Sequence, residues 1–86
     1  MTRYHFHTSD GVVFRDEDGE DLATLDHACA AAVQILTEML PGHREAFLRS
    51  GRFSVNVKDA TGRLVVVLTT TLTTDASPNP ADPPRG

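Results

Sequence analysis

The segment from residue 4 to residue 14 constrains the fold most, because two runs with apolar residues at alternate positions flank Asp10-Gly11. Asp-Gly between two such runs is typical of a β-hairpin. A two-residue type I′ turn would put the aromatic side chains on opposite faces of the sheet. A three-residue loop over residues 9–11, with a bulge at the glycine, pairs Phe6 with Phe14 and gathers the aromatic residues on one face. Because a buried face fixes strand register, we predict the three-residue loop.

A helix is predicted after this hairpin. Thr24 is a suitable N-cap, and apolar residues recur behind it at spacings of three and four, which is the period of one helix face. Cys29 belongs to this apolar stripe, so its thiol is expected in the core. Pro41-Gly42 ends the helix, and a short second helical stretch is expected over residues 43–49.

Two strands are predicted in the C-terminal half, joined by a turn over residues 59–62. Residues 53–58 alternate cleanly between apolar and polar side chains. The last strand, from residue 63 to about residue 73, is apolar on both faces, and such strands are usually covered on both sides. The two sets expected on opposite faces are Val65 with Val67, and Leu64 with Val66 and Leu68.

The element order β-β-α-β-β indicates an α+β fold, a four-stranded antiparallel sheet with one main helix packed on one face. Residues 1–74 are expected to form this single domain, and the proline-rich residues 75–86 to be a disordered tail. One helix leaves the second face of the sheet uncovered. The side chains predicted on that second face are those of His5, His7, Val13, Ser54, Asn56, Lys58, Val65 and Val67.

The apolar members of this second face, Val13, Val65 and Val67, predict an interface with another chain. A domain of this size buries only about 60% of the surface that its unfolded chain exposes, so its stability is marginal and self-association would add to it. We therefore expect a homodimer, formed through this face or along the last strand.

The amino-acid composition limits the kinds of partner that this protein is expected to bind. The net charge of −4 disfavours binding to nucleic acid, where neutralisation of phosphates supplies most of the affinity. No apolar run approaches the ~20 residues of a membrane span, and no basic segment followed by an apolar one suggests a secretory signal. The single cysteine fits a reducing compartment. The sequence predicts a cytoplasmic protein without a membrane or nucleic-acid partner.

The candidate binding residues are His5, His7, Asp16 and Asp18. The two histidines share one face of the first strand about 7 Å apart, a usable spacing for one metal ion, and Asp16 is a possible third ligand. The acidic run over residues 16–21 departs from a calcium-binding EF-hand loop, because its glycine stands at the fourth position. A solvated acidic loop is therefore expected. Motifs for nucleophilic or phosphate-loop catalysis are not found in the sequence, so we predict neither an enzyme nor a cofactor.

Several segments resemble one family. Arg3-Tyr4-x-Phe6-His7 with Asp10-Gly11, then Asp16-Glu17-x-Gly19, and later Gly51 to Val55 and Asp59 to Val65, are similar to small bacterial proteins grouped as a domain of unknown function (the DUF6894 type). This resemblance implies a small cytoplasmic protein without an assigned reaction, and it brings no catalytic residues. Thr24-Leu25, opening an alanine-rich helix after a hairpin, also resembles HicB-type antitoxins, although their Pro-Gly and DNA-binding extension are missing.

The function expected from these observations is that of a non-enzymatic interaction module that associates with itself. Two alternatives remain open. One is a HicB-like inhibitor that masks a basic protein through the acidic loop. The other is a small metal-binding protein that uses His5 and His7.

Overall fold

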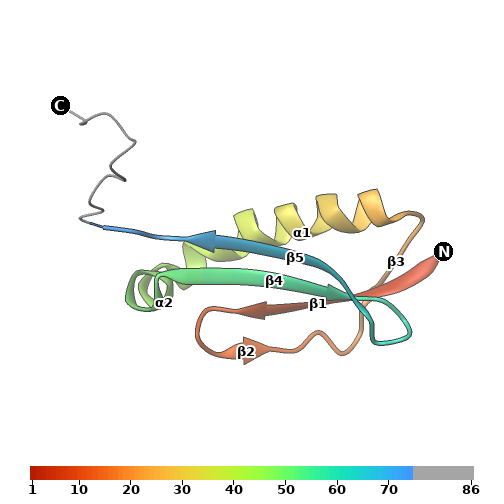
Figure 1. Ribbon diagram of the computed structural model, residues 1–86, viewed down its shortest axis with the longest axis horizontal. Coiled ribbons are helices and arrows are strands. Elements are labelled where there is room, and N and C mark those ends of the chain that lie inside the picture. The colour runs from red at the N-terminus through yellow and green to blue at the C-terminus, as the bar shows by residue number, and fades with distance from the viewer. Residues whose placement is uncertain (75–86) are drawn as a thin grey trace, which may run out of the picture.

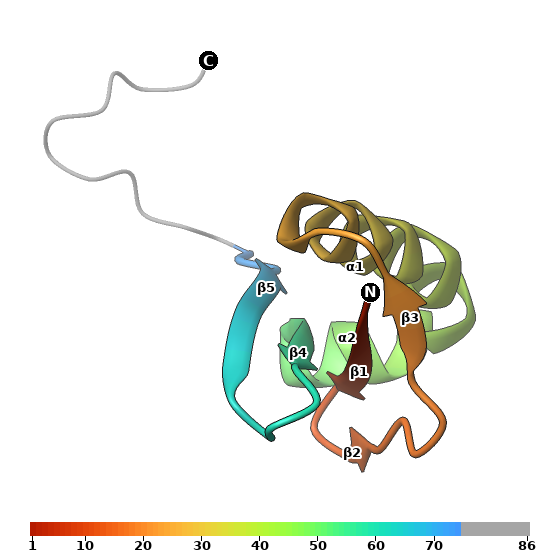
Figure 2. The same ribbon diagram turned by 90° about the vertical axis from the view of Figure 1, so that its right-hand side faces the viewer.

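The computed structural model describes residues 1–74, which form an antiparallel five-stranded sheet with helices on one face (Figures 1 and 2). The α+β class is thereby confirmed, with one strand more than predicted. Its elements in chain order are β1 (Thr2–Ser9), β2 (Val13–Phe14), β3 (Glu20–Leu22), α1 (Leu25–Met39), a 3-10 helix (Leu40–His43), α2 (Arg44–Ser50), β4 (Arg52–Lys58) and β5 (Leu64–Thr71). The predicted disordered tail lies outside the described residues.

β1 has more pairing partners than any other strand of the sheet, because it pairs with three strands. The strand order is β2-β1-β4-β5, and β3 pairs with the first part of β1. β3 is not predicted from the sequence. It is three residues long and two of them are acidic, so it lacks the apolar alternation that identifies a strand.

The register predicted for the first hairpin is wrong by two residues. Phe14 lies opposite Thr8 rather than Phe6, and the three loop residues are 10–12. The cause is the side chain of Asp10, which is buried and accepts a hydrogen bond from the Val12 N–H at 3.2 Å. This bond closes the turn one residue later than expected, which shifts the pairing of the two strands by two residues. Phe14 is consequently 48% exposed, and its ring meets the edge of His43 instead of the main core.

The core lies between α1 and the sheet. The Thr24 hydroxyl accepts a hydrogen bond from the His27 N–H at 3.1 Å, which confirms the predicted N-cap. Ala28 and Ala32 are fully buried, because side chains this small let the helix approach the sheet closely. The prediction that Cys29 lies in the core is wrong: its side chain is exposed. The other core residues are Tyr4 and Phe6 of β1 and Phe53, Val55 and Val57 of β4.

A β-bulge changes which residues of β5 face the helix. The pairing of β4 with β5 shifts between Val57 and Lys58, so that Lys58 lies opposite Leu64. Val65 consequently packs against the core, so its predicted place on the other face, among the interface residues, is wrong. Leu64 takes its place there and is 49% exposed. A bulge of one residue reverses the faces of the residues beyond it, because side chains alternate along a strand.

Candidate functional site

The candidate site is built around Asp16, in the loop that joins β2 to β3. Both of these strands pair with β1, and they leave a gap between them at Phe6. The Asp16 carboxylate fills that gap: Oδ2 accepts a hydrogen bond from the Phe6 N–H and Oδ1 accepts one from the Gly19 N–H, both at 3.0 Å. One side chain therefore takes the place of a strand at this position of the β1 edge.

The backbone of Asp16 binds both histidines of β1. Its N–H donates to His7 Nδ1 and its carbonyl oxygen accepts from His5 Nδ1, each over 3.0 Å. An N–H can only donate and a carbonyl can only accept, so the two rings hold opposite tautomers. Neutral His7 carries its proton on Nε2, whereas His5 carries one on Nδ1. The rings stack with their centroids 6.4 Å apart and their planes 10° apart.

Gly19 allows this loop to lie against β1. Its φ of +73° belongs to the left-handed region, and a Cβ at this position would lie 2.8 Å from the Tyr4 carbonyl oxygen. Only glycine fits such a backbone approach without displacement. The acidic run is thus attached to β1 through Asp16 and Gly19, while its other four side chains are exposed to solvent, as predicted: Glu17, Asp18, Glu20 and Asp21.

Two shifted pKa values follow from this arrangement. Burial by itself would raise the pKa of Asp16, but hydrogen bonds from the N–H groups of Gly19, Phe6 and Asp18 outweigh it and lower that pKa below 3.8. Burial lowers the pKa of His7 below 6.5, and the positive charge of Lys58 lowers it further. Asp16 is therefore held as a carboxylate, and His7 as a neutral ring.

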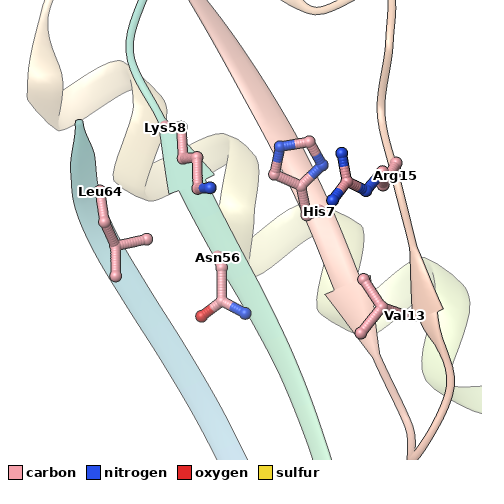
Figure 3. A pocket seen from close by; sticks show the side chains of 6 residues that line it. All are labelled: His7, Val13, Arg15, Asn56, Lys58 and Leu64. Atoms are coloured by element: carbon pink, nitrogen blue, oxygen red, sulfur yellow. The ribbon is translucent and has the colours of Figure 1, made fainter. Parts of the chain in front are cut away.

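Beside His7, the open face of the sheet forms a shallow cavity of about 290 Å³. Figure 3 shows the side chains of Arg15 and Lys58 on either side of the His7 ring, with Asn56 below. The alternation of side chains explains this grouping, since Asn56 lies opposite His7 and Lys58 lies opposite His5 on neighbouring strands. Val13 and Leu64 border the cavity.

The structure brings three of the four predicted binding residues together: His5, His7 and Asp16. Asp18 is exposed and takes part through its backbone, with its carbonyl oxygen bound to the Arg3 guanidinium. Residues 1–74 contain no group of three or more histidine, cysteine, aspartate or glutamate side chains placed to hold a metal ion. Both oxygens of Asp16 and Nδ1 of His7 already accept backbone hydrogen bonds.

The sequence places Asn56 and Lys58 on the same face as His7, but it does not identify them or Arg15 as binding residues. Their outward positions could be inferred from strand alternation, but the pairing of β1 with β4 that joins them could not. Of the predicted interface residues, Val13 and Val67 are 64% and 56% exposed.

The fold and this site define a small α+β domain in which a single layer of helices covers one face of an antiparallel sheet. The chain belongs to the family described as Domain of unknown function (DUF6894), whose sequence model matches residues 3–71. The comparisons found no matching curated protein and no matching solved structure. Within residues 1–74, no helix combines the length and the apolar character needed to cross a membrane.

Proposed function

We propose that this protein is a non-enzymatic interaction module that forms a homodimer by pairing β5 with β5 of a second copy. The observation that carries the proposal is the outer edge of β5. This strand lies at the end of the sheet, and no segment of residues 1–74 pairs with its outer side (Figure 2). Unpaired N–H and C=O groups along such an edge form hydrogen bonds readily with another strand.

β5 lacks the features that usually prevent edge pairing. Its eight residues, Leu-Val-Val-Val-Leu-Thr-Thr-Thr, include no charged side chain and no proline. The bulge lies at its first residues, next to Lys58, and leaves regular pairing over the rest of the strand. A long, uncharged and regular edge of this kind favours the addition of a strand.

A second copy of the chain is the partner that fits this edge best. Antiparallel pairing of one strand with itself generates a twofold axis, and twofold dimers are the commonest oligomers. β-branched residues dominate β5, and they pack well in cross-strand pairs. Val67 is more than half exposed in one chain and would gain a neighbour across the axis.

The test compares two lysine substitutions on the same face at opposite edges of the sheet. Val67→Lys adds a charge to β5, and Val13→Lys adds the same charge to β2, at a side chain of similar exposure. Light scattering after size exclusion at micromolar concentration should show a dimer for the natural chain and for Val13→Lys, and a monomer for Val67→Lys. A monomeric natural chain contradicts the proposal. Loss of the dimer in both variants would place the contact on the open face instead.

A further inference from the structure

The cavity on the open face is lined by hydrogen-bond donors. His7 presents Nε2–H, because Asp16 occupies Nδ1, and Figure 3 shows this edge of the ring turned toward Lys58. An ammonium group and a ring N–H that face each other share no hydrogen bond, since both donate. The Arg15 guanidinium approaches the ring from the other side, and Asn56 adds its amide below.

These cations have no anionic partner within the described part of the chain. The one salt bridge found there joins Arg3 to Asp21, so no carboxylate of residues 1–74 lies within 4.0 Å of Arg15 or Lys58. A neighbouring hollow brings the carboxylates of Asp16, Glu17 and Asp59 near Arg15 and Lys58, but none of them forms a salt bridge with either cation. Asp16 and Asp59 accept backbone hydrogen bonds instead. A protein with a net charge of −4 thus keeps two cations outside any salt bridge of residues 1–74, beside a ring N–H donor.

We propose that this cavity binds the phosphate group of a small organic phosphate through His7, Arg15 and Lys58. A phosphate dianion offers three terminal oxygens, and the site supplies a guanidinium fork, an ammonium group and two neutral donors. The two permanent positive charges match a dianion better than a single carboxylate.

The volume of the cavity and the residues around it limit the size of the ligand that can bind. At about 290 Å³ it lies near the lower limit for small-molecule sites, which is roughly 300 Å³. Val13 and Leu64, each about half exposed or more, border it and would cover an apolar group attached to the phosphate. The acidic loop at residues 16–21 lies nearby and would repel a long polyanion such as nucleic acid.

This inference goes beyond self-association and does not depend on it. Pairing through the outer edge of β5 leaves the open face uncovered, so a monomer and a dimer both present the cavity. A natural chain that proved monomeric would contradict the dimer and leave the phosphate site intact, and the absence of phosphate binding would leave the dimer intact.

The experiment is a titration of the full ¹⁵N-labelled chain, followed by NMR, with phenyl phosphate and with inorganic phosphate as separate probes. We expect saturable shifts of the Asn56 side-chain amide and of backbone amides around Arg15 and Lys58. Phenyl phosphate should bind more tightly than inorganic phosphate, because its ring contacts Val13 and Leu64. Equal affinity would overturn the organic ligand, and shifts that do not saturate would overturn the site.

A matched pair of double variants separates a specific site from general charge attraction. Arg15→Gln/Lys58→Gln should weaken phenyl phosphate binding by at least about tenfold, as expected for lost charge-assisted hydrogen bonds. Arg44→Gln/Arg49→Gln removes two exposed positive charges from α2 and should leave the affinity unchanged. Equal weakening in both double variants would overturn the proposal, as would tighter binding of a single-stranded oligonucleotide than of phenyl phosphate. Because all four side chains are exposed, both variants should fold, and the map of shifts in the natural chain tests the site without any variant.

Discussion

Two loops of this protein share the pattern Asp-x-x-Gly. The hydrogen bonds that the two aspartates accept, however, span very different distances along the chain. The loop at Asp16–Gly19 and the turn at Asp59–Gly62 each place an aspartate oxygen against backbone N–H groups, and each contains a glycine with positive φ. All the hydrogen bonds found for Asp59 stay within its own turn. Asp16 instead reaches Phe6, ten residues earlier in the chain.

The difference shows how one local pattern serves two purposes. The turn at Asp59 only reverses the chain between β4 and β5, and it does so at the surface. The loop at Asp16 completes the edge of β1, fixes the tautomer of His7 and thereby directs Nε2–H toward the cavity. Substitutions at matched positions of the two loops should therefore have unequal effects.

The largest difference is expected between Asp16→Ala and Asp59→Ala. Asp16→Ala leaves the Phe6 and Gly19 N–H groups without their carboxylate partner, and we expect a loss of about 2–3 kcal/mol after allowance for solvent screening. Asp59→Ala exposes its freed N–H groups to water, so its loss should be much smaller. Urea unfolding followed by circular dichroism measures both variants.

The control for this first pair is Asp16→Asn, which keeps the shape and one acceptor oxygen. It should fall between the natural chain and Asp16→Ala. If Asp59→Ala destabilised the protein as much as Asp16→Ala, the long-range hydrogen bonds of Asp16 would not set the difference between the loops.

The second comparison uses the two glycines. Both have positive φ, +73° at Gly19 and +85° at Gly62, so alanine at either position is strained by a similar amount, about 1 kcal/mol. A Cβ at Gly62 meets nothing within 4 Å, whereas at Gly19 it would collide with the Tyr4 carbonyl oxygen. Gly19→Ala should therefore cost about 2 kcal/mol in total. Thermal unfolding of the alanine variants at Gly19 and Gly62 measures how much more the first one destabilises the protein. Equal midpoint temperatures would show that the loop moves away from β1 freely.

The third comparison separates the hydrogen bond of His7 from its ring. His7→Ala removes the acceptor of the Asp16 N–H and should cost about 1 kcal/mol. In His7→Asn, the amide oxygen can occupy the place of Nδ1, and most of this loss should be recovered. Hydrogen exchange of the Asp16 amide measures this hydrogen bond directly. The protection of the amide from exchange should fall in the alanine variant and return in the asparagine variant. Unchanged protection in His7→Ala would mean that the loop does not depend on this bond.

The sequence predicted the fold class because alternation and helical periodicity are strong in residues 4–8, 25–40 and 53–68. It predicted the N-cap at Thr24 and the turn at 59–62 because both are local. The features that depend on long-range contacts were not predicted from the sequence. β3 has no apolar pattern, the hairpin register depends on the buried Asp10 side chain, and the reversal at Val65 depends on a bulge.

The site shows the same division between local and long-range information. His5, His7 and Asp16 were selected from the sequence as possible metal ligands, and the structure brings them together through hydrogen bonds to the Asp16 backbone. Nothing in the residue types distinguishes an aspartate that binds a metal from one that completes a strand edge. That distinction requires the pairing of β1 with both β2 and β3.

The smallest expected effect is the dependence of stability on pH. The folded pKa of His7 lies below 6.5, so below that pH the unfolded chain binds a proton that the folded chain refuses. The contribution of His7 to the free energy of unfolding is therefore complete above pH 6.5. It is lost as the pH falls through the lowered pKa of His7 in the folded chain. Asp16 and Asp59, whose folded pKa values lie below 3.8, add their losses only at lower pH.

This order of titration separates the two loops. Between about pH 7.5 and 5, the protein should lose stability through His7, because burial and the charge of Lys58 lower the pKa of its ring, whereas Asp59 contributes nothing there. The free energy of unfolding in urea, measured across this range, should fall with pH in the natural chain and fall less in His7→Asn. Asp59→Asn, as the matched control, should keep the natural slope. If His7→Asn kept it too, then burial of the His7 ring and the positive charge of Lys58 would not oppose protonation of that ring in the folded chain.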